Sequence, residues 1–132
     1  MSKLEATIVK IDNVDSLHMV TFDFSGYKLK MMSLDLGDNI NIGTKVLLGI
    51  KPISVALAKE LGGALSYSNQ IDSKIEFIEE GQLLSSIKLL AYGKTFESII
   101  TTNSLKRMNL SVGDDVMALI KANEIFIAEV LG

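Results

Sequence analysis

Two groups of polar residues in this chain have the types and spacing to bind a small anion. The central segment, residues 62–70, begins with two glycines and continues to Ser66, Ser68 and Asn69. Glycine frees the backbone, and short hydroxyl and amide side chains add neutral donors to the main-chain N–H groups. Lys51 and Lys121 each end a predicted strand, and either lysine would offset negative charge. This combination favours a small tetrahedral dianion.

Hydrogen bonding alone could supply the affinity of such a site. If each charge-assisted hydrogen bond contributes about 1.5–3 kcal/mol, four or five of them reach the roughly 8 kcal/mol that corresponds to micromolar binding. A metal cation is not required. An arginine cluster is not required either, and Arg107 is the only arginine in the chain.

The same residues offer little for catalysis. The chain has one histidine, His18, and no cysteine, and it lacks the nucleophile-elbow, metalloprotease and phosphate-loop motifs. His18 lies in a predicted strand of alternating apolar residues, where a structural role is expected. We therefore predict a protein that is not an enzyme, with no catalytic residues and no organic cofactor.

Composition also limits the partners. A net charge of −3 with a single arginine argues against nucleic acid. No stretch approaches the roughly 18 uncharged apolar residues of a membrane span, so we expect a cytoplasmic protein without a membrane partner. A mean hydropathy of +0.33 is high and predicts apolar surface that other subunits cover.

The chain repeats itself once. Equivalent residues lie 67 positions apart early in each half and 70 positions apart later, as in the pairs Leu17/Leu84, Gly26/Gly93, Val46/Val116, Lys51/Lys121 and Ala58/Ala128. The difference is an insertion at 102–110, where capping residues precede a short amphipathic run. A short helix is predicted there in the second half.

Strand signals recur in both halves. Alternating apolar residues predict strands over 3–12, 18–24, 27–31 and 45–51, with a separate strand over 53–58 after Pro52, and their counterparts over 71–79, 83–90, 95–101, 116–121 and 125–128. We expect an all-β fold of two tandem five-stranded antiparallel barrels of the oligonucleotide/oligosaccharide-binding (OB) type. The expected division is a first repeat at 1–61, a central anion-binding linker at 62–70 and a second repeat at 71–132. The phenylalanines are expected to fill the barrel cores: Phe22, Phe24, Phe77, Phe96 and Phe126.

Four segments together resemble the molbindin family, whose Mop or TOBE domains bind molybdate and tungstate. They are residues 65–71, 98–104, 110–114 and 118–122. The resemblance implies molybdate or tungstate as the bound ligand and self-association as a homotrimer, with a dimer as the alternative. It also implies an oxyanion site formed by Ser66, Tyr67, Ser68, Asn69, Thr101, Lys121 and Ala122. Tyr67 and Ser68 stand where the family usually has alanine and arginine, so a side-chain contact is lost and main-chain donation is expected at Ser68.

The first repeat departs further from this pattern. Met1 and Ser2 occupy the place of Ser68 and Asn69, and Pro52 removes the N–H that Ala122 can offer. Sites built on Lys51 are therefore expected to be weaker than those built on Lys121.

Three functions remain open at this point. The first is non-catalytic molybdate or tungstate binding for intracellular storage and metal homeostasis. The alternative is a regulatory module that senses the oxyanion for a transcription factor or an ABC transporter. Storage is the leading hypothesis, because neither a helix-turn-helix nor an ATPase segment accompanies the two repeats. A nucleic-acid-binding barrel is the third reading, and the negative charge argues against it.

Overall fold

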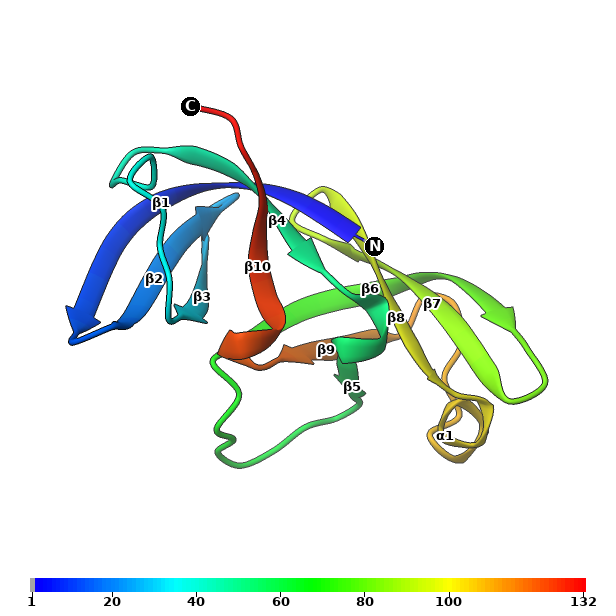
Figure 1. Cartoon of the computed structure of the whole chain (residues 1–132). Helices are drawn as coiled ribbons and strands as arrows, with labels where there is room; N and C mark the ends of the chain where they lie inside the picture. The colour runs from blue at the N-terminus through cyan, green and yellow to red at the C-terminus, as the bar shows by residue number, and fades with distance from the viewer. Residues whose placement is uncertain (1) are drawn as a thin grey trace.

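Two five-stranded antiparallel sheets make up nearly all of the structure (Figure 1). The structure is a computed structural model that describes residues 2–132. The first half contains β1 (Ser2–Val14), β2 (Leu17–Phe24), β3 (Tyr27–Ser33), β4 (Lys45–Ile50) and β5 (Ala56–Ala58). The second half contains β6 (Asn69–Glu80), β7 (Leu84–Ala91), β8 (Lys94–Thr101), β9 (Asp115–Ile120) and β10 (Ile125–Val130). The all-β fold with OB-like repeats is confirmed.

Three short helical elements join these strands. The helix α1 (Thr102–Arg107) lies in the second half, as predicted, and the Thr101 hydroxyl caps it by accepting from the Ser104 N–H at 3.1 Å. The 3₁₀ turns η1 (Pro52–Ser54) and η2 (Ala122–Glu124) occupy equivalent places after β4 and β9. Each of these turns directly follows one of the two lysines, Lys51 or Lys121.

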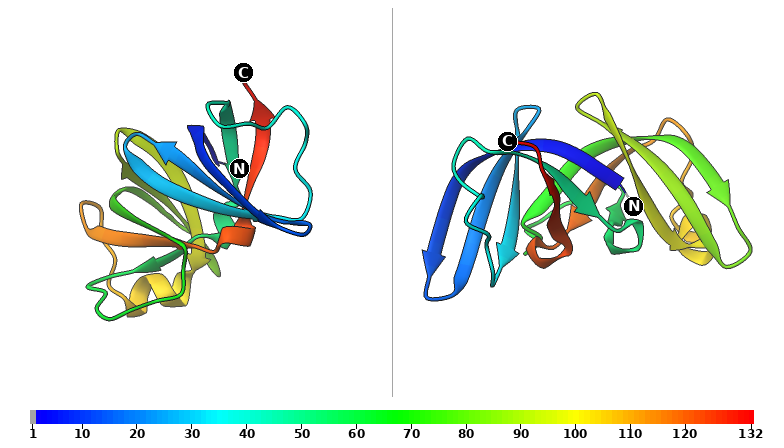
Figure 2. Two further views of the ribbon diagram at one scale, coloured as in Figure 1. Left: turned by 90° about the vertical axis from the view of Figure 1, so that its left-hand side faces the viewer. Right: turned by 45° about the horizontal axis from the view of Figure 1, so that its top comes forward.

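The longest strand of each half bends so that it can pair with two neighbours. Strand β1 pairs with β4 from Ser2 to Thr7 and with β2 from Thr7 to Val14, and a bulge at Val9 separates Ile8 from Lys10. An extra residue on one strand bends it and increases its twist. Strand β6 has the equivalent bulge at Glu76. Both sheets therefore curl, as the right-hand view of Figure 2 shows.

Two tight hairpins follow from local sequence. Ser25 and Gly26 connect β2 to β3 with φ values of 49° and 89°, and Tyr92 and Gly93 connect β7 to β8 with φ values of 52° and 79°. Positive φ at both central residues matches the twist of the flanking strands, and glycine at the second position adopts it without strain.

The two halves exchange their last strands. The sheet orders are β10-β4-β1-β2-β3 and β5-β9-β6-β7-β8, so β10 completes the first sheet and β5 completes the second. Gly49 of β4 faces Phe126 of β10, and at the equivalent place in the other sheet Leu119 of β9 faces Ala56 of β5. A small residue thus meets a larger one in both pairs. The sequence did not predict this exchange.

One hydrophobic core runs through both halves. Leu4, Phe22 and Leu48 from the first half belong to the same buried cluster as Ile71 and Ile120 from the second. Neither half therefore buries its apolar residues alone, in keeping with the small size of each unit.

Several expectations need correction. The strand predicted over 53–58 is shorter, because the Ser54 N–H donates back to the Lys51 carbonyl at 2.9 Å and forms η1 before β5 begins. Phe77 is 57% exposed, because the bulge at Glu76 shifts it to the solvent face, and Phe126 is 36% exposed although its ring packs over Gly49. The helix expected over 102–110 ends at Arg107, and β1 continues to Val14. Phe22, Phe24 and Phe96 are buried, as predicted.

Candidate oxyanion site

Asn69 links the second half of the chain to the edge of the first sheet. Its side chain is fully buried. The Asn69 Oδ1 accepts from the Lys30 N–H at 2.7 Å, and Nδ2 donates to the Lys30 carbonyl at 2.9 Å and to the Ile120 carbonyl at 3.2 Å. The amide has two N–H donors, and both point at carbonyls. Asn69 therefore acts as a clamp that holds β3, β6 and the end of β9 together.

Tyr27 reinforces this contact between the halves. Its hydroxyl donates to the Gln70 carbonyl, and its ring stacks on Tyr92 with centroids 5.4 Å apart. Burial raises the pKa of the Tyr27 hydroxyl, so the group remains a neutral donor at physiological pH. The edge of β3 is thus fixed beside the start of β6.

The lysine turn of the second half lies next to the Asn69 clamp. Asn69 is the strand partner of Ile120, and Lys121 follows directly in extended conformation with an exposed side chain. The Ala122 N–H is the first of η2 and has no partner within that turn. Lys121 and Ala122 can therefore present an ammonium group and a main-chain donor at the same place.

The first half repeats the arrangement with different residues. Ser2 takes the place of Asn69, is the strand partner of Ile50, and accepts at Oγ from the Glu97 N–H at 3.0 Å. Lys51 follows Ile50 and is exposed, but Pro52 has no N–H to offer. Met1, which the sequence places opposite Ser68, lies outside the described residues.

The central segment contains Ser66, Tyr67 and Ser68 and leads directly into Asn69. Ser66 and Ser68 are exposed, and Tyr67 is half-buried, with its carbonyl accepting from the Gln70 Nε2 at 2.9 Å. No helix or strand occurs between 62 and 68, and the last two residues of the predicted linker, Asn69 and Gln70, open β6.

Thr101 lies elsewhere in the chain. It ends β8, pairs with Leu84 and caps α1, which Figure 1 places well away from the start of β10, where η2 lies. The structure thus brings Asn69, Lys121 and Ala122 together within one chain, and it does not bring Thr101 to them.

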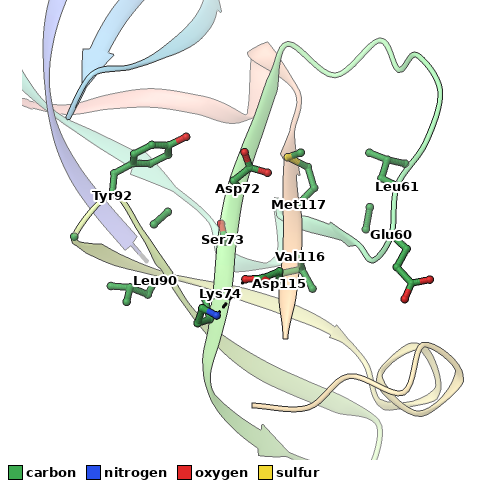
Figure 3. Close-up of a pocket in the computed structure, with 13 residues that line it drawn as sticks. Glu60, Leu61, Asp72, Ser73, Lys74, Leu90, Tyr92, Asp115, Val116 and Met117 are labelled. Carbon is green, nitrogen blue, oxygen red and sulfur yellow. Dashed lines mark ion pairs between the residues drawn. The ribbon is translucent and has the colours of Figure 1, made fainter. Parts of the chain in front are cut away.

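A hollow of about 770 Å³ beside β6 does not suit an anion (Figure 3). Three carboxylates line it, from Glu60, Asp72 and Asp115, and its one lysine, Lys74, already pairs with Asp115 at 3.3 Å. The charge balance therefore opposes a dianion. Among residues 2–132, no group of three or more histidine, aspartate or glutamate side chains is placed to hold a metal ion.

Sequence reasoning missed the two residues, one in each half, that Asn69 and its counterpart Ser2 contact. Lys30 and Glu97 lie 67 positions apart and occupy equivalent places, one against Asn69 and the other against Ser2. The repeat spacing could have paired them with one another. It gave no sign that each would contact the opposite half of the chain.

A comparison with protein families matches residues 65–127, and the matching family is described as the TOBE domain. This part of the chain is a TOBE domain. The matched residues include Ser66 and Ser68 of the central segment, β6, α1 and the Lys121 turn. The match confirms the family resemblance drawn from the sequence.

One solved structure has the same fold over nearly the whole chain. The molybdate-bound crystal structure of ModG, a cytoplasmic molybdate-binding protein, has a TM-score of 0.89 and 21% identity, covering 95% of this chain and 93% of that chain. This similarity establishes the shared fold of both repeats, including the TOBE domain. A molybdate-binding protein from Sporomusa ovata aligns with 27% identity and a TM-score of 0.49 over 51% of this chain and 100% of its own.

Two further comparisons are negative. No curated protein sequence matches the chain. Within residues 2–132, the helices are too short and too polar to cross a membrane.

Proposed function

We propose that this protein binds molybdate or tungstate without catalysis and serves intracellular storage or homeostasis of the oxyanion. The observation that carries the proposal is that one TOBE domain holds both the central donors and the Lys121 turn, with Asn69 joined to Ile120 between them. The molybdate bound in ModG, which shares the fold, supports the same ligand class here.

The donors of the proposed site are main-chain N–H groups, the hydroxyls of Ser66 and Ser68, and the Lys121 ammonium. Asn69 acts indirectly, because both of its N–H donors are used by carbonyls. Four or five charge-assisted bonds at about 1.5–3 kcal/mol each are sufficient for micromolar binding. Binding therefore depends on backbone geometry more than on a charged side chain from the central segment.

We further propose that the protein is cytoplasmic, as ModG is described to be, and that it self-associates as a homotrimer. Large apolar side chains on its surface support self-association: Val14, Leu34 and Leu83 are 73%, 72% and 80% exposed. A neighbouring subunit could then supply a donor, such as Thr101, that one chain does not bring to the Lys121 turn.

Calorimetric titration with molybdate, tungstate and sulfate tests the function. We expect micromolar binding of molybdate or tungstate by wild-type protein whose oligomeric state is fixed by light scattering. Lys121→Ala is expected to weaken binding more than Lys51→Ala, because Ala122 offers an N–H and Pro52 does not. An absence of heat with molybdate and tungstate at micromolar protein would refute the function. An equal or larger loss from Lys51→Ala would refute the ranking of the two sites.

A further inference from the structure

The two lysine turns are structurally equivalent but have opposite charges beside them. Strand β3 packs against η2, and strand β8 packs against η1. Lys30 is the residue of β3 that Asn69 clamps, and Glu97 is the residue of β8 that Ser2 clamps. The repeat therefore places a lysine beside Lys121 and a glutamate beside Lys51.

Lys30 lies close to the Lys121 turn. The carbonyls of Lys30 and Ile120 accept from the same Asn69 nitrogen, at 2.9 Å and 3.2 Å, so they lie within two hydrogen-bond lengths of each other. Lys121 follows Ile120, and the side chains of both lysines are exposed. The backbones of residues 30 and 121 are therefore close together, and flexible side chains from both can bring their ammonium groups within the roughly 8 Å over which charges interact at physiological ionic strength.

Glu97 has the equivalent position beside Lys51. Its N–H donates to Ser2, which is paired with Ile50, and its carboxylate accepts from the Ser86 hydroxyl at 3.2 Å. Lys88 is the strand partner of Glu97, but its ammonium pairs with Glu76 at 3.5 Å. The Glu97 charge is therefore not neutralised by an ion pair within the described residues.

The other carboxylates near the Lys121 turn and the Lys51 turn are similar. Asp72 follows Asn69 by three positions, and Glu5 follows Ser2 by three, so each clamp has one acid at the same distance along its strand. Glu124 of η2 accepts from Ser54 of η1 at 2.8 Å and is shared by both turns. Lys3 follows Ser2 where the neutral Gln70 follows Asn69, so the exchange of Lys30 for Glu97 is the charge difference at the two clamped residues themselves.

We propose that Lys30 is a second cationic residue of the Lys121 oxyanion site and that Glu97 repels dianions from the Lys51 turn. The inference rests on the proposed function and adds a determinant of affinity that the central segment does not contain. Two lysines favour a dianion at one turn, whereas a lysine and a glutamate cancel at the other. The chain thereby has one strong and one weak site, although its fold is nearly symmetric.

Calorimetric titration of four proteins with molybdate at low salt tests the proposal. The proteins are wild type, Lys30→Ala, Lys28→Ala and Glu97→Lys. Lys28 is the matched control, because it lies two residues along the same strand and its ammonium already pairs with Asp23 at 2.9 Å. The Lys30→Ala variant keeps the clamp, because Asn69 bonds only to the main chain of residue 30.

We expect Lys30→Ala to weaken the tighter binding step by about 5- to 10-fold and Lys28→Ala to weaken it less than about 2-fold. Glu97→Lys is expected to strengthen the weaker step by a similar factor, and roughly 0.5 M salt should reduce both effects. If wild type binds molybdate but Lys30→Ala matches Lys28→Ala, or Glu97→Lys leaves the weaker step unchanged, this proposal fails and the proposed function stands. If wild type binds neither molybdate nor tungstate, both fail.

Discussion

Removing the Asn69 side chain should destabilise the protein far more than removing its counterpart Ser2. The buried Asn69 side chain makes three hydrogen bonds to two backbone segments, whereas half-buried Ser2 accepts one. At about 1 kcal/mol net for each bond, with an added cost for the backbone groups left unpaired, Asn69→Ala should lower the free energy of unfolding by about 2–4 kcal/mol. The same reasoning gives about 0.5–1 kcal/mol for Ser2→Ala.

A third variant separates hydrogen bonding from packing. Asn69→Asp has nearly the same shape, so it leaves no cavity, but its carboxylate cannot donate to the carbonyls of Lys30 and Ile120. It should therefore cost at least as much as Asn69→Ala, despite filling the space. If packing were the cause, Asn69→Asp would be the milder change.

Urea unfolding of the anion-free protein measures these differences. The variants should be compared at one protein concentration, because self-association adds to apparent stability, and their m-values should agree. Equal losses from Asn69→Ala and Ser2→Ala would refute the clamp, as would an Asn69→Asp variant as stable as wild type.

Two further predictions concern charge and packing in the same fold. Two contacts lower the pKa of the Asp114 carboxyl below its ordinary value: first the N–H of Ser111 at 2.9 Å, and then the Lys59 ammonium at 3.2 Å. The contribution of Asp114 to stability is therefore present above about pH 3.9 and is lost as the pH falls through the folded pKa. Asp114→Asn should accordingly flatten the fall of the unfolding free energy between about pH 5 and pH 2, and an unchanged slope would contradict this. A methyl group at Gly49 would overlap the Phe126 ring, so Gly49→Ala should cost about 1–3 kcal/mol in urea unfolding. Phe126→Leu should recover part of that loss in the double variant, and a fully stable Gly49→Ala protein would contradict the packing.

Local sequence was sufficient to predict the hairpins and the helix. Ser25-Gly26 connects two strands directly, and Thr101 begins α1 with its own hydroxyl. In both cases the residues that decide the structure are neighbours along the chain. The repeat spacing then carried the prediction from one half to the other.

Features that depend on contacts between the halves could not be predicted in the same way. The alternation of apolar residues in β6 predicted Phe77 in the core, but the bulge at Glu76 shifts the alternation by one position. Asn69 has the side chain of an anion ligand, but its donors are used by Lys30 and Ile120. The contact between Asn69 and Lys30 spans 39 residues, and no local pattern indicates it.

Because the last strands are exchanged, each of the two lysines lies where the chain crosses from one sheet to the other. The chain leaves β4 in the first sheet through the Lys51 turn and enters β5 in the second, and it leaves β9 through the Lys121 turn and enters β10 in the first. Phe126 packs over Gly49, whereas the equivalent position in the second sheet, Leu119, has only the small Ala56 opposite it. If β10 paired with β9 and β5 with β4, Phe126 would face Leu119 and Ala56 would face Gly49. The second sheet would then be overfilled and the first underfilled.

This packing favours the exchange, which places both lysines where the chain crosses between the sheets. A dianion held at Lys121 would lie beside the Asn69 clamp and the edge of β3, so it would stabilise contacts between the halves as well as its own site. The proposed function therefore predicts that ligand binding and the association of the two repeats are coupled.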